Sequence, residues 1–533
     1  MKEKVVVLMP KLGHTTGEMP HMRNPPKNYM PGQMLYYLYT ACRNLGCDVK
    51  VIDVNWSIDP FQEVMDFGPD KLLISTATPT FQGTLDAMST LRARGYHKPI
   101  FVGGPHVSLN AGMRDWLLPP LEGVTYIPLI KSSSTFDWVP TVFPERTQFE
   151  VLGMPDAEAR KYIVERLTQE TGKEPNLTRL EPYLFSYFVP SMDWVRETYH
   201  GDHIRPEMKQ VPFRHSIITS IGCSKTCSFC GNPYIYRIGF KSKEVVRDIL
   251  RDFKRNGVDR LSVADMFFVM HMPHTQDMMD VFKEEGMQYS MQTCLENLTD
   301  ELFVELKASG LRKCLVGIEN PVSYSVGKRV EMNKLRWLLD TVQKLELEGA
   351  KLSYIVGLPG VELEHDLALL DHVVTEILSR NHPLEDLQVN LYTPYRPEGD
   401  SVYFPYGEEP PPHKPDMLKI QILNRIPFSY WGSFPVGIAS GKDFWRQLVL
   451  CDLIYDQVYA DFREVYLGVR EQYVAEIRAT YPSLALHIPT FEDSRSVFSK
   501  AMRRRSVLEK AIGNDEGRGR RVAPPMLAVG GAA

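Results

Sequence analysis

The chain has 533 residues, 43% of them hydrophobic and 24% charged, which excludes a disordered, collagen-like or coiled-coil protein. At the usual domain size, this length predicts about three domains. Lysine and arginine number 61 against 66 aspartate and glutamate residues, a formal net charge of −5, so the overall charge does not favour nucleic-acid binding.

Apolar runs in the sequence are short. The longest, such as those at residues 4–10 and 71–77, have the length of strands, and none approaches the ~20 residues that a membrane-spanning helix needs. Met1 is followed by a charged KEK segment rather than by a signal-peptide core. We therefore expect a cytoplasmic protein without a membrane span, in which the eight cysteines remain thiols.

The first 130 residues alternate short β-branched runs with amphipathic helical patterns. This alternation predicts βαβ units and an open, parallel, Rossmann-like sheet over residues 1–130. Strands are predicted at 4–9, 48–54, 71–75, 99–102 and 124–130, and helices at 32–45, 61–65 and 83–94. Ligands of such sheets bind at the carboxyl ends of the strands, here the loops at 10–14, 75–80 and 103–108. No G-x-G-x-x-G follows the first strand, so a standard dinucleotide site is not indicated.

Residues 131–211 are interrupted by prolines and show weaker periodicity. One helix is predicted at 156–170, with Asp156 as its N-cap. We interpret this segment as a linker region that packs against the domains on either side.

A second βα series occupies residues 212–405. Six strands with intervening helices predict a partial, TIM-like (β/α)6 barrel, whose functional residues would lie at the carboxyl ends of the strands. Thr299 is the expected N-cap of one helix, and Cys294 and Cys314 are expected to be buried core residues. The strands are predicted at 216–220, 260–263, 288–293, 313–318, 351–356 and 387–391, and the helices at 242–256, 274–285, 299–309, 332–347 and 363–379.

Residues 406–513 follow a proline-rich break and combine aromatic residues with helical patterns. We expect a mainly helical C-terminal region that closes the open side of the partial barrel and caps the substrate. The aromatic residues at 428–434 suit a hydrophobic core or, as the alternative, a substrate pocket. Residues 514–533 are expected to form a disordered tail.

Cys223, Cys227 and Cys230 lie within eight residues, directly after the first strand of the second series. Three thiolates on one loop can hold an iron–sulfur cluster and leave one iron open for a substrate or cofactor. A structural zinc site would need a closed set of four ligands, and the nearest histidines, His203 and His215, are unusually spaced for that role. The pattern therefore favours a cluster over zinc and over buried core cysteines.

The segment from Cys223 to Cys230, CSKTCSFC, resembles the CxxxCxΦC motif of the radical S-adenosylmethionine (radical SAM) superfamily, and the resemblance extends over residues 212–405. It implies that the three cysteines bind a 4Fe–4S cluster whose open iron binds SAM, and that reductive cleavage of SAM yields a 5′-deoxyadenosyl radical. In the same family, the residues that contact SAM correspond here to Phe229, Asp265, Gln292, Glu319, Gly357 and Pro359.

The N-terminal sheet resembles the cobalamin-binding domain of class B radical SAM enzymes, through a first strand that ends in a proline and the segment Val102-Gly-Gly-Pro-His106. Glycines after a strand let the backbone approach a bulky corrin closely. The Asp-x-His-x-x-Gly signature is absent, which fits cobalamin bound without a lower-face histidine. The resemblance implies a cobalamin site at Ser75, Thr76, Gly103, Gly104 and His106.

These features predict a cobalamin-dependent radical SAM methyltransferase. It would transfer a methyl group from methylcobalamin to an unactivated centre of a small organic substrate with an apolar portion. An external electron donor of the flavodoxin or ferredoxin type would supply the electrons. The enzyme alternative is a radical SAM cyclase, dehydrogenase or rearrangement catalyst, with or without cobalamin. The non-enzyme alternative is a corrinoid or iron–sulfur sensor module.

Overall fold

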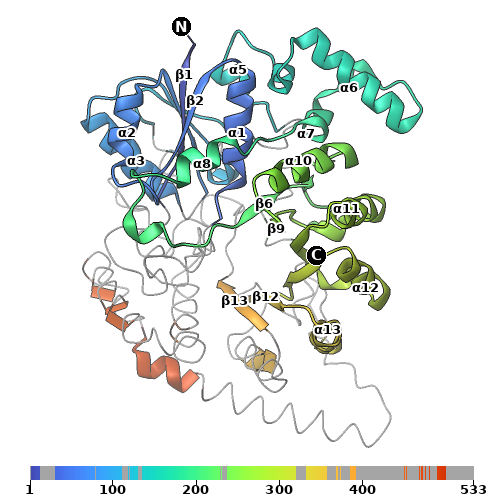
Figure 1. Ribbon diagram of the computed structural model, residues 1–533. Coiled ribbons are helices and arrows are strands. Elements are labelled where there is room, and N and C mark those ends of the chain that lie inside the picture. The colour runs from blue at the N-terminus through green and yellow to red at the C-terminus, as the bar shows by residue number, and fades with distance from the viewer. Residues whose placement is uncertain are drawn as a thin grey trace, which may run out of the picture.

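The computed structural model describes residues 2–356 with the exception of 12–29, 78–79, 111–117, 119, 130–134, 228–229, 231–236 and 320–331. Further along the chain it describes 368–369, 372–373, 384–391, 449, 452, 467–468, 470–471, 474–475, 479, 489–497 and 499. Two parallel sheets joined by a helical layer form the framework of these residues (Figure 1). The expected α/β fold is confirmed.

The first sheet has five parallel strands in the order β2-β1-β3-β4-β5. Helix α1 covers one face, and α2 and α3 cover the other (Figure 1). The bounds are β1 Lys4–Met9, α1 Gln33–Asn44, β2 Asp48–Asp53, α2 Pro60–Phe67, β3 Lys71–Ser75, α3 Phe81–Ala93, β4 Ile100–Gly103, α4 Pro105–Asn110 and β5 Val124–Tyr126.

Strand β1 shows why the first sheet forms. Val5 and Val7 pack into the core on the α1 side, whereas Val6 and Leu8 pack against α3, and all four are fully buried. A strand buried on both faces needs a continuous apolar run rather than an alternating one, which matches its sequence KVVVLM. The short apolar run of β3 follows the same rule.

A helical layer over residues 135–213 joins the two sheets. Its aromatic side chains pack on α1: the Trp194 ring lies 5.0 Å from that of Tyr36, and the Phe188 ring lies 5.5 Å from that of Tyr37. One continuous hydrophobic core therefore runs from the first sheet through this layer into the second sheet. The layer consists of α5 Val139–Val142, η2 Gln148–Leu152, α6 Asp156–Thr171, η3 Leu177–Arg179, η4 Glu181–Tyr183, α7 Leu184–Tyr187, α8 Asp193–Tyr199 and η5 Pro206–Met208.

The prediction that Asp156 caps α6 is wrong. Pro155 is the N-cap residue and Asp156 is the first helical residue. The Asp156 carboxylate instead accepts hydrogen bonds from Arg160 at 2.7 Å and from the Thr147 hydroxyl at 2.6 Å. An acidic residue in the first turn still favours the helix through its dipole.

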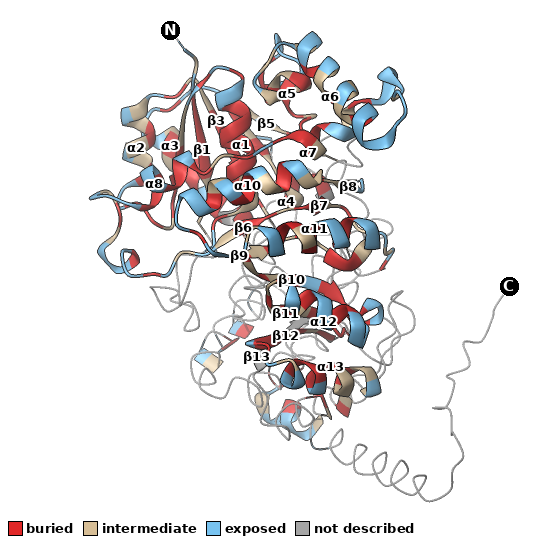
Figure 2. Cartoon of the chain, turned by 45° about the vertical axis from the view of Figure 1, so that its right-hand side comes forward, coloured by how far each residue is buried: buried red, intermediate tan, exposed pale blue. Residues whose placement is uncertain are grey.

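The second sheet has six parallel strands in the order β13-β12-β11-β10-β9-β6. Helices α10 to α13 line one side of it, with their buried residues toward the sheet (Figure 2). Cys294 and Cys314 are buried as expected, and the Thr299 hydroxyl caps α12. The bounds are β6 His215–Ile217, α10 Lys243–Arg255, β9 Arg260–Val263, α11 Met272–Glu284, β10 Gln288–Cys294, α12 Asp300–Ala308, β11 Leu311–Gly317, α13 Met332–Lys344, β12 Gly349–Val356 and β13 Leu384–Leu391.

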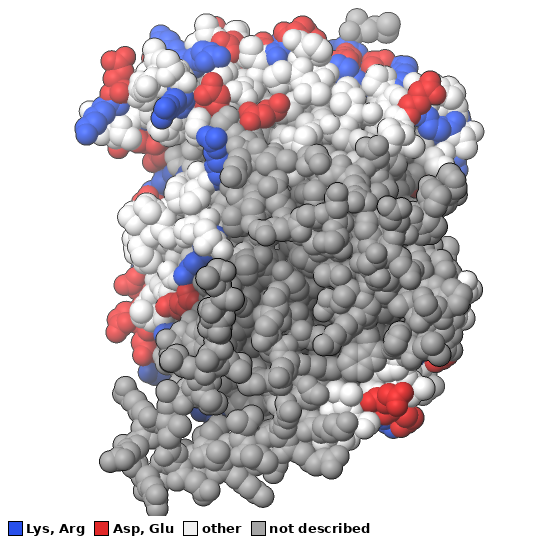
Figure 3. All heavy atoms as spheres, turned by 180° about the vertical axis from the view of Figure 1, so that it is seen from behind, with Lys and Arg blue, Asp and Glu red and all other residues white. Residues whose placement is uncertain are grey.

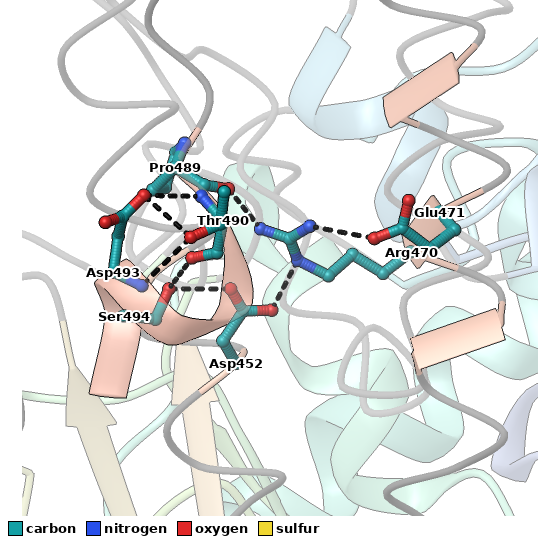
Figure 4. Close-up of polar contacts among 7 residues, drawn as sticks. All are labelled: Asp452, Arg470, Glu471, Pro489, Thr490, Asp493 and Ser494. Atoms are coloured by element: carbon teal, nitrogen blue, oxygen red, sulfur yellow. Dashed lines mark hydrogen bonds and ion pairs between the residues drawn. The ribbon is translucent and has the colours of Figure 1, made fainter. Parts of the chain in front are cut away.

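The C-terminal residues that the structure describes include a buried ion pair (Figure 4). The Arg470 guanidinium donates to the Asp452 carboxylate at 2.7 Å and to the Pro489 carbonyl at 2.6 Å. The Ser494 hydroxyl donates to the second Asp452 oxygen at 2.8 Å. These contacts join three segments that lie up to 42 positions apart. The aromatic residues at 428–434, the helix predicted at 363–379 and the tail at 514–533 lie wholly or largely outside the described residues.

Arg470→Met is expected to destabilise this C-terminal region by about 3–5 kcal/mol, because Asp452 would stay buried without its partner charge. Thermal unfolding followed by fluorescence would show the loss as a lower apparent melting temperature. Arg495→Met is the matched control, since the Arg495–Glu492 pair is exposed and contributes little. Equal melting temperatures for the two variants would contradict the prediction.

No helix among the described residues is long and apolar enough to cross a membrane. On the face shown in Figure 3, the described Lys and Arg side chains are interspersed with Asp and Glu. This part of the surface therefore presents both signs of charge rather than a continuous basic field.

Candidate functional site

The three-cysteine loop follows strand β6 at the carboxyl end of the second sheet. A small antiparallel hairpin closes its base, formed by β7 (Ser220–Ile221) and β8 (Gly239–Phe240). Gly222, directly before Cys223, has a φ of +77°, and a Cβ atom there would lie 2.7 Å from the Arg237 carbonyl oxygen. Only glycine fits this close approach of the two arms of the loop without distortion.

Neighbouring elements hold the loop as well. The Ser224 N–H donates to the Met270 sulfur at 3.1 Å, and the Lys225 ammonium pairs with Glu296 at 2.6 Å. Met270 follows β9 and Glu296 follows β10, so the carboxyl ends of the next two strands contact the loop. The sequence alone did not identify these two residues, because each contact spans more than 40 positions.

The cysteines of the loop are thiols, not disulfides. Cys227 is buried, and Cys223 and Cys230 are half-buried. The Cys230 N–H donates to the Cys227 carbonyl at 3.0 Å, so these two residues share one turn. Within the described part of the chain, no three His, Cys, Asp or Glu side chains are gathered into a ready-made metal site. The fit of an iron–sulfur cluster therefore rests on the donor chemistry and spacing of the three thiols.

Asp265, a predicted SAM contact, lies just beyond β9 and is completely buried. Its carboxylate accepts hydrogen bonds from the Thr219 N–H at 2.6 Å, the Thr219 hydroxyl at 2.5 Å and the Ser220 hydroxyl at 2.8 Å. Burial raises the pKa of Asp265, and these hydrogen bonds oppose the rise. The structure thus places Asp265 beneath the cysteine loop rather than on an accessible cofactor surface.

Gln292, another predicted SAM contact, is exposed in the middle of β10. Its neighbours Tyr289 and Met291 are buried, with Tyr289 stacked on Phe282 of α11, so Gln292 points to the opposite face of the sheet. Ser290 shares that face with Gln292, and its hydroxyl lies 3.2 Å from that of Ser262 on β9. A polar surface therefore lines the side of the sheet away from α10 to α12.

Helix α1, which packs on the first sheet, contacts the second sheet on this polar face. Gln33, the first residue of α1, donates a hydrogen bond to the Ser216 hydroxyl of β6, and Ser216 pairs with Ser262 in the sheet. Helix α1 begins at the carboxyl edge of the first sheet because it follows β1. The carboxyl edge of the first sheet thus meets the second sheet beside its polar face.

Glu319, a further predicted SAM contact, lies two residues after the end of β11. Its backbone is left-handed, with a φ of +47°. Its N–H and that of Ile318 both donate to the Ser353 carbonyl at 2.9 Å. Such a conformation is uncommon for a non-glycine residue and is typical of functional loops. Glu319 is nearly fully buried at the carboxyl end of the sheet, the edge at which its role was expected.

The predicted cobalamin residues gather where β3 and β4 end. Ser75 pairs with Gly103, the Thr76 N–H donates to the Gly103 carbonyl at 2.8 Å, and Thr76 is fully buried. Gly104 has a φ of +102°, and a Cβ atom there would lie 2.5 Å from the Thr76 carbonyl oxygen. The close approach to Thr76 thus already requires glycine at this position, and the role of Gly104 in corrin approach stays a prediction.

His106 is buried in α4, and its ring stacks on that of Phe81 at 3.9 Å. This environment matches a histidine packed within the domain rather than one exposed above a corrin. Its direct contact with cobalamin is therefore disfavoured. Phe229, Gly357 and Pro359 lie outside the described residues.

Lys241, which no motif identified, is completely buried at the end of the β7–β8 hairpin. Its ammonium donates to the carbonyls of Phe185 at 2.9 Å and Phe188 at 2.7 Å, and it lies 5.3 Å from the Tyr37 ring of α1. Burial lowers its pKa to about 7, with Asp265 acting in the opposite direction. Lys241 thus ties the cysteine loop to the helical layer and the first sheet.

Two family models match the chain: the Radical SAM superfamily over residues 217–373 and the B12 binding domain over residues 24–115. Among solved structures, the radical S-adenosylmethionine methyltransferase TsrM from Kitasatospora setae, with cobalamin and a 4Fe–4S cluster bound, is similar with a TM-score of 0.51. The identity is 16%, and the match covers 74% of this chain and 74% of that chain.

The structure of TsrM with its tryptophan substrate and the SAM analogue aza-SAM gives a TM-score of 0.50 and 15% identity, over 74% of this chain and 73% of that chain. No curated protein sequence matches the chain. At such identities, the similarity to these structures shows a shared fold.

Proposed function

Because the chain carries a radical SAM domain behind a B12-binding domain, the arrangement of class B radical SAM enzymes, we propose that it is a cobalamin-dependent methyltransferase acting on a small organic substrate. The observation that carries this proposal is that the carboxyl edge of the first sheet, the candidate cobalamin site, lies against the second sheet, which carries the cysteine loop. Gln33 at the carboxyl edge of the first sheet bonds to Ser216 of β6, the strand that leads into the cysteine loop.

In this proposal the cluster and SAM supply the radical, cobalamin carries the methyl group, and a flavodoxin- or ferredoxin-type protein supplies electrons. The chain itself holds and orients these groups. Cys223, Cys227 and Cys230 would bind the cluster. The SAM surface would include Phe229, Gln292, Glu319, Gly357 and Pro359.

The corrin would lie over Ser75 and Gly103, where β3 and β4 end. We infer a substrate with both a polar and an apolar portion. The polar face of β9 and β10, with Ser262 and Ser290, suits hydrogen bonding, and the aromatic residues at 428–434 suit an apolar group. That TsrM takes tryptophan supports a substrate of this size. A cyclase, dehydrogenase or rearrangement enzyme on the same scaffold is the alternative.

Anaerobically reconstituted protein is expected to bind both iron–sulfur cluster and hydroxocobalamin, seen as separate absorption bands. After reduction, methyl-labelled SAM should convert the bound corrinoid to labelled methylcobalamin with release of one S-adenosylhomocysteine. This test needs no substrate, and a protein-free reaction is its control. Cluster without corrinoid binding would instead favour the alternative enzyme class.

A further inference from the structure

The Asp265 carboxylate accepts its hydrogen bonds from the two residues that lead into the cysteine loop. Thr219 contributes its N–H and its hydroxyl, and Ser220 contributes its hydroxyl, at 2.5 to 2.8 Å. Asp265, Thr219 and Ser220 are each at most 2% exposed. Hydrogen bonds to a buried carboxylate are among the stronger ones in proteins.

The role of Asp265 is neither that of a helix cap nor that of a surface ligand. Helix α11 begins at Met272 and is capped by His271, so Asp265 lies well outside its first turn. Its side chain has no solvent exposure. What remains is its contact with the strand segment before Gly222 and Cys223.

Thr219 is held from its other side as well. The Lys241 N–H donates to the Thr219 carbonyl at 2.8 Å, next to the β7–β8 hairpin. The Lys241 ammonium in turn binds two carbonyls of the helical layer. The first arm of the cysteine loop is therefore fixed to β9 through Asp265 and to the helical layer through Lys241.

We propose that Asp265 is a positioning residue for the cluster: its carboxylate fixes Thr219 and Ser220, and thereby the arm that carries Cys223, before any cofactor binds. The inference rests on the proposed function only in that the loop receives an iron–sulfur cluster. Lys241 completes the anchor from the opposite side. Neither side chain needs to touch the cluster or SAM.

The test compares Asp265→Asn and Thr219→Val with two controls. Thr219→Val keeps the shape of the side chain and removes the hydroxyl that donates to Asp265. Thr219→Ser keeps this hydroxyl and should behave like the wild type. Tyr289→Phe removes an equally buried hydrogen bond, the 2.8 Å contact with Ser309, at the far end of β10. Should Asp265→Asn fail to fold, the comparison of Thr219→Val with Thr219→Ser still tests whether the hydrogen bond to Asp265 holds the loop.

Amide hydrogen exchange of the cluster-free protein is the first measurement. Peptides over 217–227 should exchange about tenfold faster in Asp265→Asn and several-fold faster in Thr219→Val, with no change in Thr219→Ser or Tyr289→Phe. After reconstitution, the same two variants should lose iron to a chelator faster by similar factors, and their reduced clusters should show altered electron paramagnetic resonance spectra.

Unchanged exchange at 217–227 in both variants would overturn the proposal, as would an equal acceleration in Tyr289→Phe. If the wild-type protein binds no iron, the proposed function fails, while the exchange experiment still tests the anchor. If the wild type binds iron and both variants retain it equally well, the inference fails and the proposed function stands.

Discussion

Purified Cys223→Ala, Cys227→Ala and Cys230→Ala variants are expected to lack the brown ~400 nm absorption of a 4Fe–4S cluster, because each removes one of its three thiolates. Iron content should fall to near background, and SAM cleavage to 5′-deoxyadenosine should be undetectable. The measurements are iron analysis and chromatography of the SAM products after anaerobic reconstitution and reduction.

The fold should survive these substitutions, because the loop is held by contacts that do not involve the sulfur atoms. The close approach at Gly222, the Lys225–Glu296 ion pair and the Asp265 hydrogen bonds all remain. Cys314→Ala is the matched control: Cys314 is buried in β11, and burial raises the pKa of its thiol to about 12. That variant should keep a full cluster. A full complement of iron in any of the three loop variants would contradict the cluster assignment.

The sequence predicts those features that depend on neighbouring residues. Strands at 4–9 and 71–75 are predicted at their observed bounds, because each is a continuous apolar run between charged or polar residues. The cysteine loop is found for a similar reason: its three thiols lie within eight positions. Family models over 24–115 and 217–373 agree with both domain assignments, whereas the domain boundaries at 130, 211 and 405 stay predictions.

Features that depend on register between distant strands could not be predicted. Asp265 and Thr219 lie 46 positions apart, and only the pairing of β6 with β9 brings them together. Lys241 looks like an ordinary surface lysine in the sequence, yet the structure buries it against the helical layer. The Asp156 error has a local cause, because an aspartate suits both the N-cap and the first helical turn.

Gly104→Val is expected to weaken hydroxocobalamin binding by at least about tenfold. The side chain would meet the Thr76 backbone, with its Cβ 2.5 Å from the carbonyl oxygen and 2.8 Å from the nitrogen. A φ of +102° adds strain of about 1–3 kcal/mol for any residue with a side chain. The ends of β3 and β4 must therefore separate, which disrupts the proposed corrin surface even though Gly104 need not touch the corrin.

Gly103→Ala separates this clash from a general effect of added bulk. Its Cβ atom would lie 3.5 Å from the Ile127 carbonyl oxygen, an ordinary contact, so the strand ends should stay in place. Equilibrium dialysis with hydroxocobalamin, together with melting temperatures, would compare the two variants with the wild type. We expect Gly103→Ala to keep the wild-type melting temperature, so that weaker binding in this variant would report direct contact between the corrin and Gly103. Wild-type affinity in folded Gly104→Val would show that the corrinoid binds elsewhere than the ends of β3 and β4.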